Sequence, residues 1–175
     1  LAISPPKRGF EDILKMTTEI GIDIIQPLIS ERQIKKVSNH SLKMDRWYSI
    51  INESVEQSER LWRPELYSFI DVNDWINSLN KNDFVSISVT RSDNTIGLRK
   101  WISNKKIIKG KNFIIWNVIG PEGGWSKNEI EKFRNLKMQF IKLSENILRT
   151  STAAINTASV LAECREELMR SIYYS

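Results

Sequence analysis

Residues 113–124 read Phe-Ile-Ile-Trp-Asn-Val-Ile-Gly-Pro-Glu-Gly-Gly and join an almost wholly apolar run to a glycine-rich loop. An apolar run of this length is typical of a central parallel strand that is buried on both faces. Ser126 and Glu129 follow with the spacing of a capping box, which predicts a helix to about Leu136. A buried strand, a glycine loop and a capped helix in this order are typical of ligand-binding α/β domains.

The sequence on both sides of this stretch alternates short apolar runs with helical patterns, as α/β domains do. Strands are predicted at 1–4, 24–29, 84–89 and 140–143. Pro27 indicates an edge position or a bulge. Helices are predicted at about 9–20, 45–58, 72–79 and 151–172. We therefore expect residues 1–175 to form one α/β domain with a mostly parallel sheet flanked by helices.

Composition leaves several function classes open and argues against others. The formal net charge of +5 fits a polyanionic partner, and it fits equally a basic protein without such a partner. With Cys164 as the only cysteine, neither a disulfide framework nor a cysteine-based zinc site is expected. The single histidine, His40, lies in a polar stretch that resembles a loop, which argues against Ser-His-Asp chemistry. No apolar run approaches the roughly 20 residues of a membrane span, so a cytoplasmic protein is expected. A bound metal is not expected either.

Two further segments each allow two interpretations. Residues 91–112 are polar and basic, and Lys105 and Lys106 lie close to two more lysines. This segment is either a solvated loop or a patch that contacts phosphates. In the last predicted helix, four alanines give one face small side chains, at positions 153, 154, 158 and 162. That face serves either internal packing or a subunit interface.

The glycine loop is compatible with more than one ligand class. A phosphate-binding P-loop needs a lysine after its glycines, and no lysine stands there. A dinucleotide fingerprint needs G-x-G-x-x-G, whereas this loop has G-x-x-G-G with Pro121 inside it. Glu145 follows a short strand where a ribose-binding acid is expected, but too little sequence remains for a full nucleotide-binding half. A tight turn without any ligand is the remaining alternative.

A second loop, residues 143–150, lies between the last predicted strand and the last helix. It places two apolar residues, Ile147 and Leu148, beside a single arginine, Arg149. Apolar side chains suit an adenine ring, and an arginine suits a carboxylate or a phosphate. Two such loops after two strands are expected to form the walls of one pocket.

Together the two loops resemble the paired signature of the ribosomal RNA small-subunit methyltransferase E family, a member of the knotted SPOUT class. The resemblance rests on residues 119–126, 129, 143–144 and 147–150. Similar positions also occur in the first third of the chain, at Lys15, Glu19, Gly21, Pro27, Arg32, Arg46, Trp47, Glu53, Gln57, Ser58, Arg60 and Pro64. The matching segments cover roughly two-thirds of the chain. Three positions depart from the family pattern, at Trp125, Ser144 and Ser151.

The resemblance implies an S-adenosylmethionine-dependent enzyme that methylates N3 of a uridine in 16S ribosomal RNA. It implies a C-terminal trefoil knot and a homodimer. The family usually carries a small N-terminal RNA-binding (PUA-like) domain as well, which is expected to be absent from this chain. Alternatives are a ribose 2′-O-methyltransferase of the same class and a non-catalytic RNA-binding module. The expected cofactor-binding residues are Ser88, Val89, Ile119, Gly120, Pro121, Gly123, Gly124, Leu143, Ser144, Ile147 and Leu148. The expected RNA-binding or pocket-rim residues are Glu19, Arg32, Gln57 and Arg60, with Lys105 and Lys106 as phosphate contacts.

The chemistry of the expected reaction suggests two catalytic residues. The cofactor supplies an activated methyl group, so the protein has to position the acceptor nitrogen. When N3 of uracil loses its proton, negative charge spreads onto the carbonyl oxygens. Arg149 is expected to stabilise that charge, and its alternative role is a salt bridge at the helix start. Glu122 is expected to orient the loop or the substrate, and its alternative role is to cap neighbouring amides.

Overall fold

Strand β6 (Ile115–Ile119) occupies the centre of the sheet in the computed structural model, which describes residues 1–33, 40–91, 95–106 and 112–173. It pairs in parallel with β1 (Ala2–Ile3) on one side and with β5 (Phe84–Ser88) on the other. The sheet has seven strands in the order β3-β2-β1-β6-β5-β7, and β4 pairs with β2. The remaining strands are β2 (Ile24–Ile29), β3 (Glu65–Leu66), β4 (Ile70–Asp71) and β7 (Gln139–Ile141). Every recorded pairing is parallel, as the sequence predicts.

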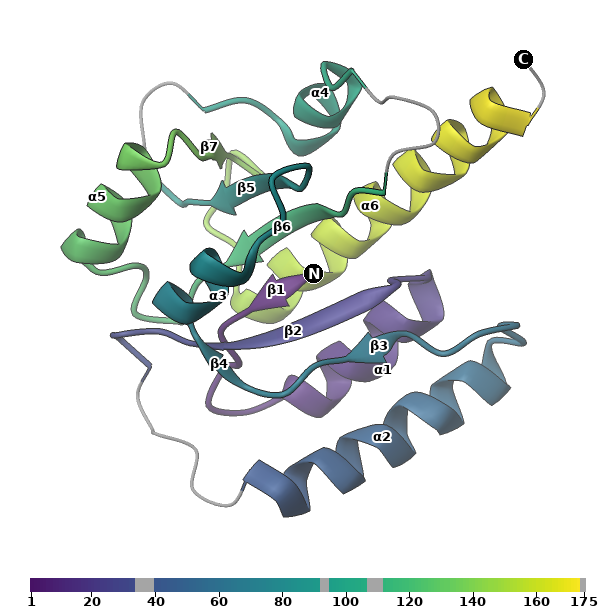
Figure 1. Cartoon of the computed structure of the whole chain (residues 1–175). Coiled ribbons are helices and arrows are strands. Elements are labelled where there is room, and N and C mark those ends of the chain that lie inside the picture. Colours follow the sequence, from purple (N-terminus) through teal and green to yellow (C-terminus); the bar gives the residue numbers. More distant parts are fainter. Residues whose placement is uncertain (34–39, 92–94, 107–111, 174–175) are drawn as a thin grey trace.

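Helices cover both faces of this sheet (Figure 1). They are α1 (Phe10–Ile20), α2 (His40–Gln57), α3 (Val72–Ser78), α4 (Leu98–Ser103), α5 (Lys127–Asn135) and α6 (Thr150–Tyr173). Side chains of α1, α2 and α6 pack in one cluster with Ile3, Ile25 and Ile119 of the strands. Side chains of α3 and α5 pack in another with Leu28 and Val118. Successive side chains of a strand therefore reach opposite faces, both of which are buried.

The position of Pro27 differs from the expectation of an edge strand or a bulge. Strand β2 has neighbours on both sides, with β1 on one and with β3 and β4 on the other. The Gln26 backbone N–H donates to the carbonyl oxygen of Leu1, just before β1, so the nitrogen of Pro27 faces the opposite side. There β3 has ended and β4 has not yet begun. The missing N–H therefore lies at a break in the ladder, where it costs no strand hydrogen bond.

Two other segments are more helical than the sequence indicates. Helix α2 begins at His40, five residues before the predicted start, so the prediction of a loop there is wrong. Residues 91–112 contain α4, whose Leu98, Trp101 and Ile102 are buried against β7 and α6. These three apolar side chains are spaced i, i+3, i+4, but the surrounding lysines and polar residues mask that pattern in the sequence.

The alanine face of α6 serves internal packing and not a subunit interface. Ala154 and Ala158 are completely buried within the single chain, and Ala153 and Ala162 are nearly so. Helix α1 packs along this face, where the missing side-chain volume lets the two helices approach closely. An interface between subunits, if formed, must use another surface.

Candidate active site

One large cavity lies at the carboxyl ends of the parallel strands. Its volume is about 990 Å³, and its walls come from the loops that follow β1, β2, β5, β6 and β7. Sites for small molecules commonly measure roughly 300–1,000 Å³, so this cavity has room for a cofactor-sized ligand. In open parallel sheets, ligands bind at this edge because the loops of several strands converge there.

The glycine loop after β6 is held in shape by a tight turn and by one aromatic ring. The Gly124 backbone N–H donates to Pro121 O at 2.8 Å, and Gly124 has a φ of +69°, which disfavours other residues. An added Cβ at Gly120 would lie 2.8 Å from the Trp125 ring, so only glycine fits there. The Trp125 indole N–H donates to Ser88 O at 3.1 Å. Trp125 thereby ties the end of β5 to the glycine loop.

Gly123 is less constrained by the chain than its place in the motif suggests. An added Cβ would meet Arg32 at 3.6 Å, an ordinary contact distance, and the φ of Gly123 is not in the left-handed region. The chain itself therefore tolerates a side chain at this position. A loss of ligand binding in a Gly123 variant would report on the ligand and not on the fold.

Glu129 has a wider role than the capping box that the sequence predicts. The capping box is present, with the Ser126 hydroxyl accepting from the Glu129 N–H and the Glu129 carboxylate accepting from the Ser126 N–H. The second carboxylate oxygen accepts from the Glu31 N–H at 3.1 Å. Next to it, Arg32 Nη1 donates to Gly123 O at 3.2 Å. The loop after β2 is therefore fastened to the glycine loop at two points.

A buried polar network supports the cavity from inside the sheet. Asn117 on β6 is completely buried, and its side-chain oxygen accepts from Ser88 Oγ at 2.8 Å and from Thr157 Oγ1 at 3.0 Å. Its amide donates to Ser86 Oγ at 2.9 Å. One side chain thus joins β5, β6 and α6. Because buried polar groups are costly when left unpaired, this network fixes the relative positions of the three elements.

The second loop, between β7 and α6, presents both apolar side chains and backbone donors. Leu143 and Leu148 pack partly against the core, whereas Ile147 is 63% exposed. The Ser144 hydroxyl accepts from the Asn146 N–H at 3.1 Å and shapes the turn. No described residue accepts a hydrogen bond from the backbone N–H of Ile147 or Leu148. These groups are available to a ligand with acceptor atoms, such as the edge of an adenine.

Arg149 occupies the capping position of α6, where its carbonyl accepts from the Ala153 N–H. Its side chain is exposed, and no described residue forms an ion pair or a hydrogen bond with the guanidinium. A cation at the positive end of a helix dipole is unfavourable unless an anion is present. The salt bridge suggested by the sequence is therefore not formed within the described chain. Glu122 is likewise exposed, and its carboxylate accepts from no described amide.

The structure brings together every residue that the sequence assigns to the cofactor or to catalysis. The cavity wall contains all of them, and Arg32 as well: Ser88, Val89, Ile119, Gly120, Pro121, Glu122, Gly123, Gly124, Leu143, Ser144, Ile147, Leu148 and Arg149. The expected RNA-side residues outside this wall are Glu19, Gln57, Arg60, Lys105 and Lys106.

Arg60 is not a pocket-rim residue. Its Nη1 donates to Thr18 O at 2.7 Å and to Ile22 O at 3.1 Å, and its side chain is only 10% exposed. Both carbonyls lie just before β2, at the amino edge of the sheet. The six residues of β2 separate this edge from the cavity by about 20 Å. Glu19 and Gln57, on the last turns of α1 and α2, lie at the same edge, so none of the three lies at the rim of this cavity. Contact of these residues with RNA stays a prediction.

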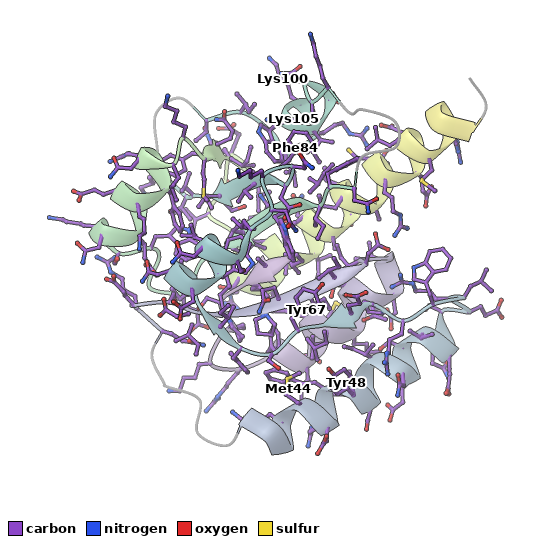
Figure 2. All side chains as sticks on the ribbon, in the orientation of Figure 1. Met44, Tyr48, Tyr67, Phe84, Lys100 and Lys105 are labelled. Carbon is purple, nitrogen blue, oxygen red and sulfur yellow. The ribbon has the colours of Figure 1, made fainter. Side chains whose placement is uncertain are left out.

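Lys105 also lies at the amino edge, and its ammonium is engaged by aromatic rings. The nitrogen lies 4.5 Å from the centre of the Trp101 ring and 5.5 Å from that of Phe84, at the start of β5 (Figure 2). Burial lowers the pKa of Lys105 because the ammonium is partly desolvated. Lys106 is exposed, and its contact with phosphates stays a prediction. The other two lysines of this patch lie outside the described residues.

Among the cavity residues that the sequence reasoning did not identify are Arg8, Asp12, Arg91 and Trp125. Arg8 follows β1 after two prolines, and Arg91 follows β5. The signal that identifies them is their place, since every loop after a parallel strand opens at the same edge of the sheet. Trp125 was visible only as a departure from a family pattern.

Comparison with known proteins settles the family. The RNA methyltransferase domain family matches residues 1–162. The chain belongs to this family. A ribosomal RNA small subunit methyltransferase E of Synechocystis sp. is 32% identical over 154 residues, or 87% of this chain. The chain spans only 49% of that relative's length. The resemblance drawn from the two loops is thereby confirmed.

Solved structures give the same fold for this RNA methyltransferase domain. A putative methyltransferase from Legionella pneumophila, solved with bound S-adenosylmethionine, superposes with a TM-score of 0.75 at 25% identity. The matched region spans 93% of this chain and 65% of the Legionella chain. A ribosomal RNA small subunit methyltransferase E from Neisseria gonorrhoeae superposes with a TM-score of 0.74 at 23% identity, and the match spans 98% of this chain and 65% of the Neisseria chain. The predicted class of fold, a mostly parallel sheet flanked by helices, is confirmed.

Proposed function

We propose that this RNA methyltransferase domain uses S-adenosylmethionine to methylate N3 of a uridine in 16S ribosomal RNA. The observation that carries the proposal is the convergence of the loops after β5, β6 and β7 on one cavity. The relatives named as small-subunit ribosomal RNA methyltransferases support the substrate, and the Legionella structure with its bound cofactor supports the cofactor.

The residues of the cavity fit such a cofactor. Backbone N–H groups of Ile147 and Leu148 without described acceptors suit the acceptor atoms of an adenine. Leu143 and the glycine loop supply apolar and backbone surface for the rest of the molecule. When bound, the cofactor supplies an electrophilic methyl group. The work of the chain is to exclude water, hold the uracil in line and stabilise the charge on it.

Two side chains are placed for this work. The guanidinium of Arg149 has no described partner, so it is available to the carbonyl oxygens of a uracil that has lost its N3 proton. Its planar fork suits two oxygens or one oxygen approached from two nitrogens. Glu122 lies on the glycine loop of the same cavity and is available to accept or orient the N3 proton.

Assembly and topology belong to this proposal as well. We expect a trefoil knot at the second loop and a homodimer with the site near the subunit boundary. With the alanine face of α6 buried, exposed apolar side chains beside the cavity are the better interface: Met16 is 38% exposed and Ile147 63% exposed. No helix within the described ranges has the length and apolar character needed to cross a membrane. A cytoplasmic location remains part of the proposal.

The test has two parts. Calorimetry with S-adenosylmethionine should give a binding heat, which a non-catalytic RNA-binding module would lack. Small-subunit RNA or particles without the mark should then yield 3-methyluridine on nucleoside analysis. A ribose-methylated nucleoside as the product would contradict the N3 assignment, and absence of any binding heat would contradict the proposed function as a whole.

A further inference from the structure

Four arginines line the cavity, and each lies after a different strand. Arg8 follows β1, Arg32 follows β2, Arg91 follows β5 and Arg149 follows β7. All four side chains are exposed. The parallel sheet therefore gathers at one opening four cations that are far apart in sequence.

Two of these arginines, Arg8 and Arg91, differ from the ion-paired arginines elsewhere in the chain in what they contact. Away from the cavity, several arginines pair with carboxylates, as Arg46 does with Glu11 and Arg99 with Glu163 and Glu167. In contrast, no ion pair or hydrogen bond joins the guanidinium of Arg8 or Arg91 to another described residue.

The charge of the cavity exceeds what the proposed cofactor needs. Its ionisable side chains are the four arginines against two acids, Asp12 and Glu122, which leaves a net charge of +2. S-adenosylmethionine brings one carboxylate, one ammonium and one sulfonium, so it adds positive charge to the site. The excess positive charge therefore favours binding of an anionic ligand other than the cofactor.

We propose that Arg8 and Arg91 bind backbone phosphates of the RNA nucleotides that flank the methyl acceptor. This inference rests on the proposed function, and it assigns the substrate-binding groups of the same site. Arg32 is engaged with Gly123 O, and Arg149 is assigned to the uracil, so Arg8 and Arg91 are the two remaining cations. A guanidinium matches two phosphate oxygens with two parallel N–H donors. Arg8 and Arg91 lie after different strands, so a strand of RNA held by both would cross the mouth of the cavity.

The experiment measures binding of single-stranded oligouridine RNA by fluorescence anisotropy over a range of salt concentrations. Each lost phosphate contact lowers the slope of log affinity against log salt by about 0.7 for a single strand. We expect Arg8→Ala and Arg91→Ala each to lower the slope by that amount, and the double variant by about twice as much. Arg170→Ala is the matched control, because Arg170 is exposed near the far end of α6 and outside the cavity.

Calorimetry with S-adenosylmethionine is run on the same variants, and we expect the cofactor affinity of both to equal that of the unmodified protein. An unchanged salt slope in both variants would overturn the inference. So would a loss of cofactor affinity without a change in slope, since the arginines would then belong to the cofactor. If the unmodified protein bound RNA with arginine-dependent slopes but bound no cofactor, the phosphate site would stand and the proposed methyl transfer would fail.

Discussion

Arginine side chains lie at both edges of the parallel sheet, and the two groups differ in their contacts with the rest of the chain. At the carboxyl edge, Arg8, Arg91 and Arg149 project around an open cavity without described partners. At the amino edge, Arg60 donates to two carbonyls of the chain, and Arg165 Nη1 donates to Gly21 O and to Asp23. Cations at one edge hold the fold together, and cations at the other are available to ligands.

The contrast shows why a basic residue is a weak signal by itself. Arg32, Arg60 and Lys105 all belong to the same predicted RNA-binding group. In the structure Arg32 lines the cavity, whereas Arg60 donates hydrogen bonds to carbonyls between the last turn of α1 and the start of β2. The ammonium of Lys105 lies over two aromatic rings. The partner of a charge, and not its sign, separates a binding residue from a structural one.

The largest expected effect is on catalysis at the carboxyl edge. Arg149→Ala should lower the single-turnover methylation rate by on the order of 10²–10³-fold, because one donor to a developing anion is lost. Stability and cofactor affinity should stay nearly unchanged, since the guanidinium of Arg149 has no described partner. Arg149→Lys should restore little, because an ammonium lacks the planar fork. A normal single-turnover rate in Arg149→Ala would remove this residue from the chemistry and direct attention to Glu122.

At the amino edge the expected effect is on stability. Arg60→Ala removes hydrogen bonds from a nearly buried guanidinium to Thr18 O and Ile22 O. Hydrogen bonds that involve a charged group contribute about 1.5–3 kcal/mol each, so we expect the loss of these two to lower the unfolding free energy by about 3 kcal/mol or more. Urea unfolding measures it, with the exposed Arg63→Ala as the control that should change little. If Arg60→Ala weakened cofactor binding and left stability unchanged, the structural role assigned to Arg60 would be wrong.

A third variant tests the packing that shapes the cavity. Gly120→Ala would bring a Cβ to 2.8 Å from the Trp125 ring, and overpacking of this kind costs about 1–3 kcal/mol. Displacement of the ring should also lengthen its hydrogen bond to Ser88 O and weaken cofactor binding. Gly97→Ala is the matched control, because no atom lies within 4 Å of its added Cβ. Equal stability and affinity in the two variants would show that Trp125 does not depend on Gly120.

The smallest expected effect concerns Lys105 and pH. Its folded pKa is lowered by burial, so the folded state releases the proton before the unfolded state does as pH rises. The stability of the unmodified protein relative to Lys105→Met should therefore increase as pH approaches the ordinary value of 10.5. At neutral pH the variant should differ by less than about 1 kcal/mol, the scale of a cation–π contact. A pH-independent difference in urea unfolding would contradict this account.

Local patterns in the sequence were enough to predict five of the seven strands, most helices and both loops of the site, but not the two-residue strands β3 and β4. The apolar run at β6 and the capping box of α5 depend only on residues that are close in sequence, so the sequence alone predicts them. The roles of Arg60 and Glu129 depend on partners 42 and 98 residues away, which no local pattern contains. Arg8 and Arg91 were missed for the same reason, because only the order of the strands brings them to one opening.

The indole of Trp125 gives the cavity an optical property of its own. Of the six tryptophans in the chain, Trp125 lies in the cavity wall, buried and held by its hydrogen bond to Ser88 O. A ligand that enters beside this ring alters its surroundings, so the intrinsic emission of the unlabelled protein should change on binding. Trp125→Phe keeps an aromatic ring at this position and removes that signal. Occupancy of the site can therefore be followed by fluorescence without any chemical label.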